Sequence, residues 1–403
     1  MNRASLSLAL FSLSVLSLAA CTSATSHSGD GGSGGTQTGA GGSPVGAGGA
    51  ATGAGGAATG TGGSTTGAGG TTAGTGGATT GAGGAASAVF KCQMPPSSYT
   101  PLASTTGLAA TAQQLTGVPP ADNYAQGFSI VEGPVWLGNA LYVSQLQGGN
   151  PPPLSRILKV VPGSPSTVFA TSDGSNGLAI LPDGDLVGAI SLADDGSICR
   201  IPLANPNSLQ IIAPGYMGVR FNAPNDLAVR SDGNIYFSDP DNNQAPKPAP
   251  QGAGHTRVYR ISPLPTATVS VVDETLSQPN GVTLSLDENT LYVSGPGLYK
   301  YAVNADGSTS ARQDGVPNPQ TYSGSDGMVF DCAGDLYIAN NSNVTVLNPA
   351  GTKVGDITIT GNGVQSVSNV AFGGADRKTL FITTLGSTPG VFTIAMPLPG
   401  MPY

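Results

Sequence analysis

The sequence predicts an all-β domain, a six-bladed β-propeller of four-stranded blades. Six similar apolar strands recur about 45 to 55 residues apart, a spacing typical of propeller blades and too long for leucine-rich or ankyrin repeats. Short apolar strands flank each of them, and helical periodicity is almost absent. The recurring strands begin at Ala140, Asp185, Asn234, Thr290, Asp335 and Thr379.

The strands follow the same order in each repeat: one short apolar strand precedes the recurring strand and two follow it. In the third repeat the expected strands cover residues 226–230, 235–238, 257–260 and 268–272. The last repeat has only three strands before the chain ends, so we expect the segment at residues 112–116 to supply the fourth. This closure would remove the exposed sheet edge that an open ring leaves.

A low-complexity segment precedes the repeats. Residues 31–90 contain no charged side chain and consist mainly of Gly, Ala, Thr and Ser, so they cannot bury enough apolar surface to offset the entropy of ordering. The expected organisation is a signal peptide at residues 1–20, a disordered tether at 21–90 and the propeller at 91–403.

The first residues have the pattern of a secretory leader. Arg3 precedes an apolar run over residues 6–20 that is too short to span a bilayer. The run ends in Leu-Ala-Ala-Cys21, which resembles the lipobox of bacterial lipoproteins and predicts lipidation of Cys21. Because the next residue is Thr22 and not Asp, resemblance to lipoprotein sorting patterns favours anchoring to the outer membrane of the cell envelope over the inner membrane. The alternative is a cysteine that follows a cleavage site by chance.

Charge and histidine content exclude several functions. Lysine and arginine total 15 against 23 acidic residues, a net charge of -8, and no basic run could follow a phosphate backbone, so nucleic-acid binding is not expected. The two histidines, His27 and His255, rule out a multi-histidine zinc site and leave His255 as the sole candidate for a Ser-His-Asp triad. Any catalysis is therefore expected to rest on carboxylates and amides, with a metal as a further candidate. A closed ring without an obvious apolar face predicts a monomer.

Three cysteines remain beyond the leader, at Cys92, Cys199 and Cys332. An odd number in an oxidising compartment allows one disulfide and one buried thiol. The sequence does not choose among the three pairings, and no spacing matches a CxxC metal site.

The first strand of each repeat would lie innermost in a propeller. The residue at its opening carries a side-chain oxygen in all six repeats. In a propeller these equivalent positions converge near one end of the central channel. Two carboxylates and four amides suit a hard divalent cation, with calcium expected and magnesium or zinc as alternatives. A purely local reading is that Asn and Asp in such turns bond their own backbone, but recurrence in all repeats favours a site. The six residues are Glu132, Asn176, Asn225, Asn280, Asp326 and Asn369.

The motifs around these residues resemble the signatures of the senescence marker protein / gluconolactonase / luciferin-regenerating enzyme family. They are Glu-Gly-Pro-Val-Trp at 132–136, Phe-Asn-Ala-Pro-Asn-Asp-Leu at 221–227, Pro-Asn-Gly-Val at 279–282, Ser-Asp-Gly-Met at 325–328 and Ser-Asn-Val-Ala-Phe-Gly-Gly at 368–374. The resemblance covers residues 109–403 in order, and it implies a six-bladed propeller with one divalent metal in the channel.

The same resemblance assigns roles to residues. It implies that the metal is bound by Glu132, Asn225, Asn280 and Asp326, with Asp326 also the general base in members that hydrolyse lactones. The remaining aligned residues, Asn176 and Asn369, are then expected to line the substrate pocket.

Other positions bear on the substrate. Ala223 stands where certain sugar-lactone members of the family place an arginine, so that sugar clamp is missing. Asn222 and His255 are the further substrate-binding candidates, and Arg220, two residues before Asn222, is another polar candidate. The alternatives are a solvated loop histidine for His255 and an ordinary strand-end residue for Arg220. Trp136 is expected to pack in the core rather than against a ligand.

Three functions follow from these features. The first is a lipid-anchored, calcium-dependent hydrolase that opens a sugar-acid or related lactone, a small-molecule substrate. The second, from a resemblance to diisopropyl fluorophosphatase, is phosphotriester hydrolysis at the same metal. The third is a non-catalytic surface propeller whose metal is structural and which binds carbohydrate or protein. Only a metal with an open coordination position can polarise a substrate.

Overall fold

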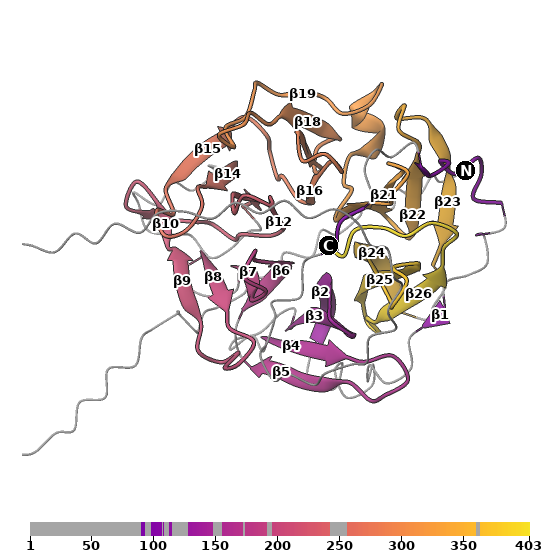
Figure 1. Cartoon of the computed structure of the whole chain (residues 1–403), viewed down its shortest axis with the longest axis horizontal. Helices are drawn as coiled ribbons and strands as arrows, with labels where there is room; N and C mark the ends of the chain where they lie inside the picture. Colours follow the sequence, from indigo (N-terminus) through magenta and orange to yellow (C-terminus); the bar gives the residue numbers. More distant parts are fainter. Residues whose placement is uncertain are drawn as a thin grey trace, which may run out of the picture. The chain divides into compact units, whose positions relative to one another are not determined.

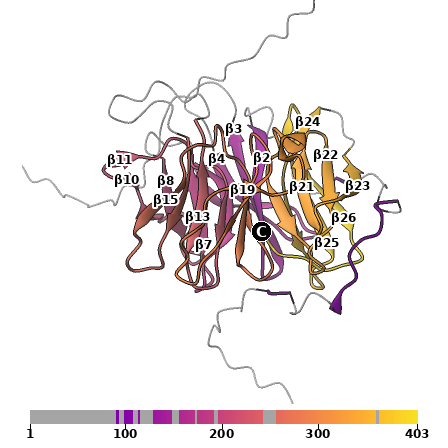
Figure 2. The ribbon, with the colours of Figure 1, turned by 90° about the horizontal axis from the view of Figure 1, so that it is seen from above.

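Antiparallel sheets follow one another around a ring (Figure 1). The computed structural model describes residues 90–92, 98–106, 108, 113–114, 128–147, 155–171, 174–191, 196–241, 256–359 and 363–403. All of them lie in one of the two units into which the chain divides, and the other unit, Ser23–Ala85, contains no described residue. Seen edge-on, the strands run across the thickness of the ring (Figure 2).

Four of the sheets are separate four-stranded meanders in which each strand pairs with the next. Their strands are β6 (Ser175–Ile180), β7 (Leu186–Ile190), β8 (Ser197–Ile201) and β9 (Gln210–Ala213); β12 (Leu227–Val229), β13 (Ile235–Asp239), β14 (Arg257–Ile261) and β15 (Val269–Asp273); β16 (Val282–Leu284), β17 (Thr290–Val293), β18 (Tyr299–Ala302) and β19 (Gln313–Asp314); and β20 (Met328–Phe330), β21 (Leu336–Asn340), β22 (Asn343–Leu347) and β23 (Lys353–Thr358).

A larger sheet contains two further meanders, joined where Ile130 pairs with Leu385. Because β1 pairs with β26, the segment upstream of the first repeat completes the last one, as predicted. The strands of the first meander are β2 (Phe128–Leu137), β3 (Ala140–Gln147), β4 (Ser155–Val160) and β5 (Thr167–Thr171), and those of the second are β24 (Val364–Gly373), β25 (Thr379–Gly386), β26 (Val391–Ala395) and β1 (Gln113–Gln114).

The recurring strands of the sequence coincide with β3, β7, β13, β17, β21 and β25. The four strands predicted in the third repeat match β12 to β15 to within about a residue at each end, as is usual for strand boundaries. Two short elements escaped prediction: a hairpin of β10 (Gly215–Tyr216) with β11 (Val219–Arg220), and a 3-10 helix at Pro319–Tyr322. Both lie in connections without apolar alternation.

The core lies between neighbouring sheets. The second strands of two meanders are covered on both faces, since all five residues of β7 and of β13 are buried. One apolar cluster joins Tyr337 of the fifth repeat to Phe372 of the sixth, and Trp136 stacks on Phe381 with ring centroids 5.3 Å apart. Trp136 is therefore a core residue, as predicted.

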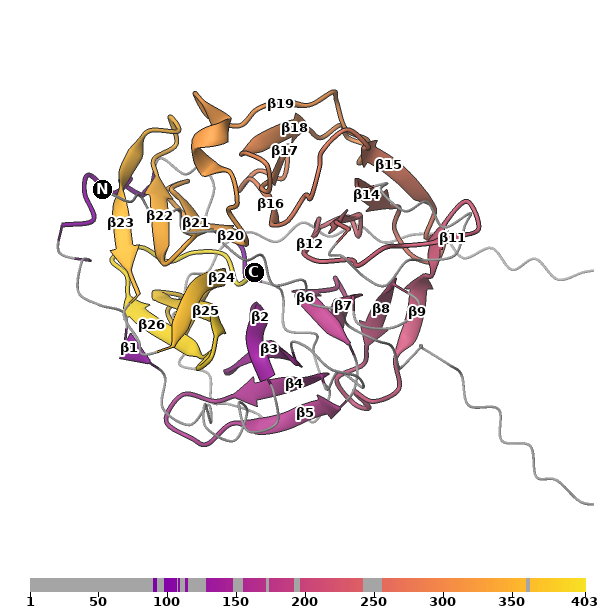
Figure 3. The ribbon, with the colours of Figure 1, turned by 180° about the vertical axis from the view of Figure 1, so that it is seen from behind.

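The C-terminal tail crosses the far ends of the innermost strands. The amide of Met401 donates to the Phe330 carbonyl (2.9 Å), and the Trp136 amide donates to the carbonyl of Pro402 (3.0 Å). The hydroxyl of Tyr403 donates to the Val229 carbonyl (3.2 Å). The C-terminus consequently lies at the centre of the ring, where Figure 3 shows it among the innermost strands.

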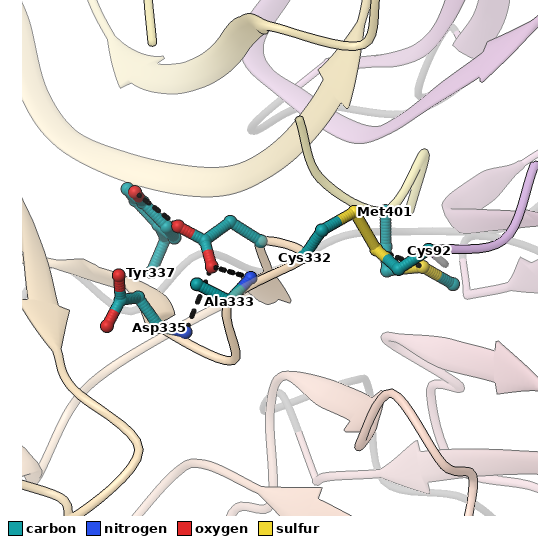
Figure 4. The surroundings of a disulfide bond; sticks show 7 residues. Cys92, Cys332, Ala333, Asp335, Tyr337 and Met401 are labelled. Atoms are coloured by element: carbon teal, nitrogen blue, oxygen red, sulfur yellow. Dashed lines mark hydrogen bonds between the residues drawn. A yellow bond between two sulfur atoms is a disulfide. The ribbon is translucent and has the colours of Figure 1, made fainter. Parts of the chain in front are cut away.

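A disulfide joins two of the three cysteines beyond the leader. Cys92 and Cys332 are bonded (Figure 4), which fastens the segment before the first repeat to the fifth repeat. The amide of Leu102 adds a hydrogen bond to Asp335 Oδ2 (2.6 Å). Cys199, the third cysteine, is fully buried in β8 and is itself disulfide-bonded, so the expectation of a buried free thiol was wrong.

Several predictions fall on residues outside those described. They are the signal peptide, the tether, the lipidation of Cys21 and the pocket role of His255. Within the part of the chain that the structure covers, no helix is long and apolar enough to cross a membrane.

Two fully buried carboxylates, Asp331 and Asp335, lie beside the disulfide. Asp331 accepts the amides of Ala333 (2.9 Å) and Asp335 (3.0 Å) and the hydroxyl of Tyr337 (3.1 Å). Burial, and then the charge of Asp335, raise the pKa of Asp331 from 3.8 to about 7. The stabilising contribution of this carboxyl is therefore fully present below about pH 4 and is lost as the pH rises through 7.

We predict that the stability of the Asp331→Asn variant depends less on pH between pH 4 and pH 8 than that of the wild type. The asparagine oxygen can keep the two backbone bonds, and its amide group can face the hydroxyl of Tyr337. The melting temperature of the variant minus that of the wild type should rise between pH 4 and pH 8, by on the order of 5 °C. Thermal unfolding of both proteins in chelator measures this difference, and a constant difference across that range would contradict the assignment.

Candidate functional site

The six aligned residues open the innermost strands, which follow one another around the axis of the ring (Figure 3). Glu132, Asn176 and Asn369 lie within β2, β6 and β24, whereas the other three residues come two positions before their strands. Those three are Asn225 before β12, Asn280 before β16 and Asp326 before β20.

The innermost strands of neighbouring repeats approach one another closely where they open. The residue after the aligned one is therefore usually glycine. A Cβ atom on Gly177 would lie 2.7 Å from the Asn225 carbonyl oxygen, and one on Gly281 would overlap the carbonyl of Asp326. Any larger residue would force these strands apart. The Glu-Gly, Asn-Gly and Asp-Gly pairs of the sequence are thus a consequence of close packing around the axis.

A hydrogen bond also joins each repeat to the next at this end. At four junctions a serine hydroxyl makes this bond. At the other two, where the recurring strand has Ala189 or Ala339 instead of serine, the backbone amide of Gly177 or Gly327 makes it. The bonds are Ser144 Oγ with Ser175 Oγ (2.8 Å), Gly177 N to the Asn225 carbonyl (2.7 Å), Ser238 Oγ to the Asn280 carbonyl (2.5 Å), Ser294 Oγ to the Asp326 carbonyl (2.8 Å), Gly327 N to the Ser368 carbonyl (2.9 Å) and Ser368 Oγ to the Val131 carbonyl (2.6 Å).

Three acidic side chains interact in this region. Glu132 is buried, and its Oε2 accepts the amide of Gly133 (2.9 Å) and the side-chain amide of Asn369 (3.4 Å). Burial, together with the charge of Asp226, raises the pKa of Glu132 to about 8. Burial and the charges of Glu132 and Asp226 likewise hold the pKa of Asp326 well above its ordinary value. As a whole residue Asp326 is half-buried, whereas Glu132 and Asp226 are buried.

Asp226 was not among the residues singled out from the sequence. It occupies the position that is glycine in the neighbouring repeats, and its two oxygens accept the amides of Leu227 (2.9 Å) and Val282 (2.8 Å). Burial raises its pKa to about 6, while these amides and Asn369 favour its charged form. The break in the glycine pattern, Asn-Asp where Asn-Gly is usual, is the sequence signal that could have identified it.

Two amide oxygens at this end have no partner. Asn176 Oδ1 and Asn280 Oδ1 are both buried without a hydrogen bond, and an unsatisfied acceptor of this kind costs about 1 to 3 kcal/mol. A divalent cation would satisfy such oxygens and offset the repulsion of the carboxylates. Within the described ranges no three His, Cys, Asp or Glu side chains are grouped closely enough to hold a metal by themselves. A donor set of both carboxylate and amide oxygens fits the residues present.

The structure thus brings Glu132, Asp326 and Asn369 together directly, and Asn369 donates to Glu132 from inside the group. Asn222 is buried in the loop before Asn225, where its backbone amide donates to Asp239 Oδ2 (2.9 Å). Arg220 is half-buried at the end of β11.

A cavity of about 190 Å³ lies at the opposite ends of the innermost strands, against Val229, Leu284 and Tyr403. Its charged residues are already paired, since Lys91 Nζ lies 2.9 Å from Glu288 Oε1 and Arg230 lies 3.3 Å from Asp232. Mainly apolar walls and paired charges make it a weaker candidate than the carboxylate end.

We predict that Gly281→Ala destabilises the fold by about 3 kcal/mol, because the added Cβ would overlap the Asp326 carbonyl. Gly324→Ala is the matched control: its φ of 81° is unfavourable for alanine, but the space around it is open, so we expect a loss of about 1 kcal/mol. Urea unfolding of both variants measures the difference, and equal losses would show that close approach is not the constraint.

We also predict that Asp326→Asn stabilises the protein in chelator, because it removes one of three mutually repelling acids. The melting temperature at pH 8 should rise by on the order of 3 °C, while added calcium should raise it less than in the wild type. Asp314→Asn, a change at an exposed residue of β19, should alter neither value. A lower melting temperature for Asp326→Asn in chelator would contradict this account.

Known proteins are similar to this chain in sequence and fold. A gluconolactonase from Zymomonas mobilis is 29% identical over 304 residues, 66% of this chain and 78% of that protein. The structure of a gluconolactonase from Xanthomonas campestris matches with a TM-score of 0.54 and 25% identity, over 75% of this chain and 95% of that one.

A calcium-binding protein, regucalcin, from Agrobacterium tumefaciens has a TM-score of 0.54 at 16% identity, over 73% of this chain and 95% of that one, which is a likeness of fold. The family described as SMP-30/Gluconolactonase/LRE-like region matches residues 130–386. This match spans more than half of the sequence, and the chain therefore belongs to that family.

Proposed function

We propose that this protein is a divalent-cation-dependent lactonase that opens a sugar-acid or related lactone to the hydroxy acid. Largely buried carboxylates and unpartnered amide oxygens lie at the same end of the innermost strands, and this observation carries the proposal. The similarity to gluconolactonases from Zymomonas mobilis and Xanthomonas campestris supports the substrate class.

The larger sheet counts as two blades in this proposal, which gives the ring six. Such a closed arrangement places one oxygen-bearing residue per blade around the axis. Glu132, Asn225, Asn280 and Asp326 would hold the cation. Calcium is the preferred ion because all four donors are oxygens and two are neutral amides; magnesium and zinc are the alternatives. When bound, the cation would polarise the lactone carbonyl and favour the developing negative charge on its oxygen.

Asp326 is the proposed general base. A carboxylate oxygen of Asp326 accepts a proton from water as the water oxygen bonds to the carbonyl carbon. The ring C–O bond then breaks, and the proton passes to the alkoxide that leaves, which gives the hydroxy acid. Burial and the charges of Glu132 and Asp226 make Asp326 more basic than an ordinary carboxylate, which this role requires. A bound cation acts in the opposite direction, so these neighbours matter to the balance.

Glu132 and Asn369 keep the geometry fixed. The amide of Gly133 and the side chain of Asn369 donate to the same oxygen of Glu132, which leaves the other oxygen for the cation. Gly327 is packed against the Asn369 side chain so closely that no Cβ atom fits there. The Glu132 carboxylate therefore has little freedom to turn, which limits reorganisation during the reaction.

We predict that the full chain hydrolyses five- or six-membered lactones after calcium is added to chelated protein. Asn280→Ala removes a proposed ligand whose oxygen has no other partner, and turnover should fall at least about 100-fold, beyond the loss typical of residues behind the ligands. Asn289→Ala, an exposed change in the same repeat, is the control and should retain activity. Acid release, corrected for spontaneous hydrolysis, is the measurement.

Each outcome has a clear meaning. Restoration by magnesium or zinc but not by calcium would correct the ion and leave the reaction. Turnover of phosphotriesters in place of lactones would replace the substrate class. If calcium raises the melting temperature while no substrate turns over, the metal is structural and the lactonase proposal fails.

A further inference from the structure

Asp239, the last residue of β13, is a carboxylate outside the proposed ligand set. It is 1% exposed. Its Oδ2 accepts the backbone amide of Asn222 (2.9 Å) and its Oδ1 accepts that of Ala223 (2.8 Å). Both oxygens of one charged group therefore hold two consecutive residues of the preceding connection, and hydrogen bonds to a charged acceptor are stronger than those between neutral groups.

The same connection leads directly into the proposed ligand Asn225. The residue before Asp239, Ser238, accepts the Asn225 amide at its carbonyl (2.9 Å) and the Asp226 amide at its hydroxyl (3.1 Å). Its own amide donates to the Asp226 carbonyl (3.0 Å). The end of β13 thus fixes the backbone on both sides of Asn225, with Asp239 holding the part that precedes it.

We propose that Asp239 is a positioning residue that sets the affinity of the site for its cation by holding the backbone that presents Asn225. The inference rests on the proposed function only in taking Asn225 as a ligand. Asp239 acts through the amides of Asn222 and Ala223 and does not itself touch the cation. Residues that orient metal ligands typically change metal affinity or activity by about 10- to 100-fold when they are replaced.

The carboxylate is needed because both of its oxygens are acceptors. Asparagine at position 239 has nearly the same shape but offers one oxygen and one amide group. Its amide group would face a backbone N–H, so one of the two bonds would be replaced by two opposed donors. Asp239→Asn therefore releases the connection without creating a cavity.

The test is a calcium titration of the full chain by calorimetry, with lactone kinetics measured on the same samples. Asp239→Asn should weaken calcium binding by about 10- to 100-fold, and saturating calcium should restore most of kcat. Asp331→Asn is the matched control: it changes another buried carboxylate that accepts two backbone amides, at the opposite end of the innermost strands. It should leave calcium affinity unchanged. Asn225→Ala should weaken binding at least as much as Asp239→Asn.

Wild-type calcium affinity in Asp239→Asn, or a loss equal to that in Asp331→Asn, would overturn the inference, as would unaltered binding in Asn225→Ala. If Asp239→Asn is not folded, Asp239→Ser replaces it, because the smaller side chain leaves room for water at both amides, and the same loss of affinity is expected. Absence of lactone turnover in the wild type would defeat the proposed function alone, since the calcium titration still decides the role of Asp239.

Discussion

The site depends on the close approach of the innermost strands where they open. Gly177, Gly281 and Gly327 leave no room for a Cβ atom there, and hydrogen bonds such as Ser294 Oγ to the Asp326 carbonyl cross every junction between repeats. A single sheet spaces equivalent side chains at least 4.7 Å apart along a line. Closing the sheets around an axis gathers one residue from each repeat at the same place, and strong contacts across the junctions make that place rigid.

This convergence opposes stability. Burial raises the pKa of Glu132, Asp226 and Asp326, and the charge of Asp226 raises the pKa of the other two further. The Asn280 side-chain oxygen has no hydrogen-bond partner. A sequence selected for stability alone would replace at least one acid and one amide. Their presence together supports the proposed functional site, because unfavourable local interactions at such sites are balanced by the rest of the fold.

Local pattern was sufficient to predict the recurring strands, their order and the completion of the last repeat by β1, because these follow from alternation of apolar residues and from turns nearby in the sequence. It also marked Glu132 and Asp326, since the aligned position carries a side-chain oxygen in every repeat. What it could not supply depends on contacts distant in the chain. The Cys92–Cys332 bond spans 240 residues. The two hydrogen bonds of Asp239 are made to backbone amides, which every residue type except proline has. Nothing in the residue types at 222 and 223 indicates that their amides are held.

The two ends of the innermost strands use the same device for different purposes. Asp331 and Asp239 are both buried carboxylates that accept successive or nearby backbone amides. At the end of the innermost strands where Asp331 lies, the disulfide and the C-terminal tail add further bonds across the strands. The fixed backbone there helps to close the ring. At the other end the fixed backbone carries Asn225, the proposed ligand, beside acids whose mutual repulsion the proposed cation would offset. The difference in what each carboxylate holds, a closing turn or the connection that carries the proposed ligand, supports the proposal that the second end is the place for chemistry.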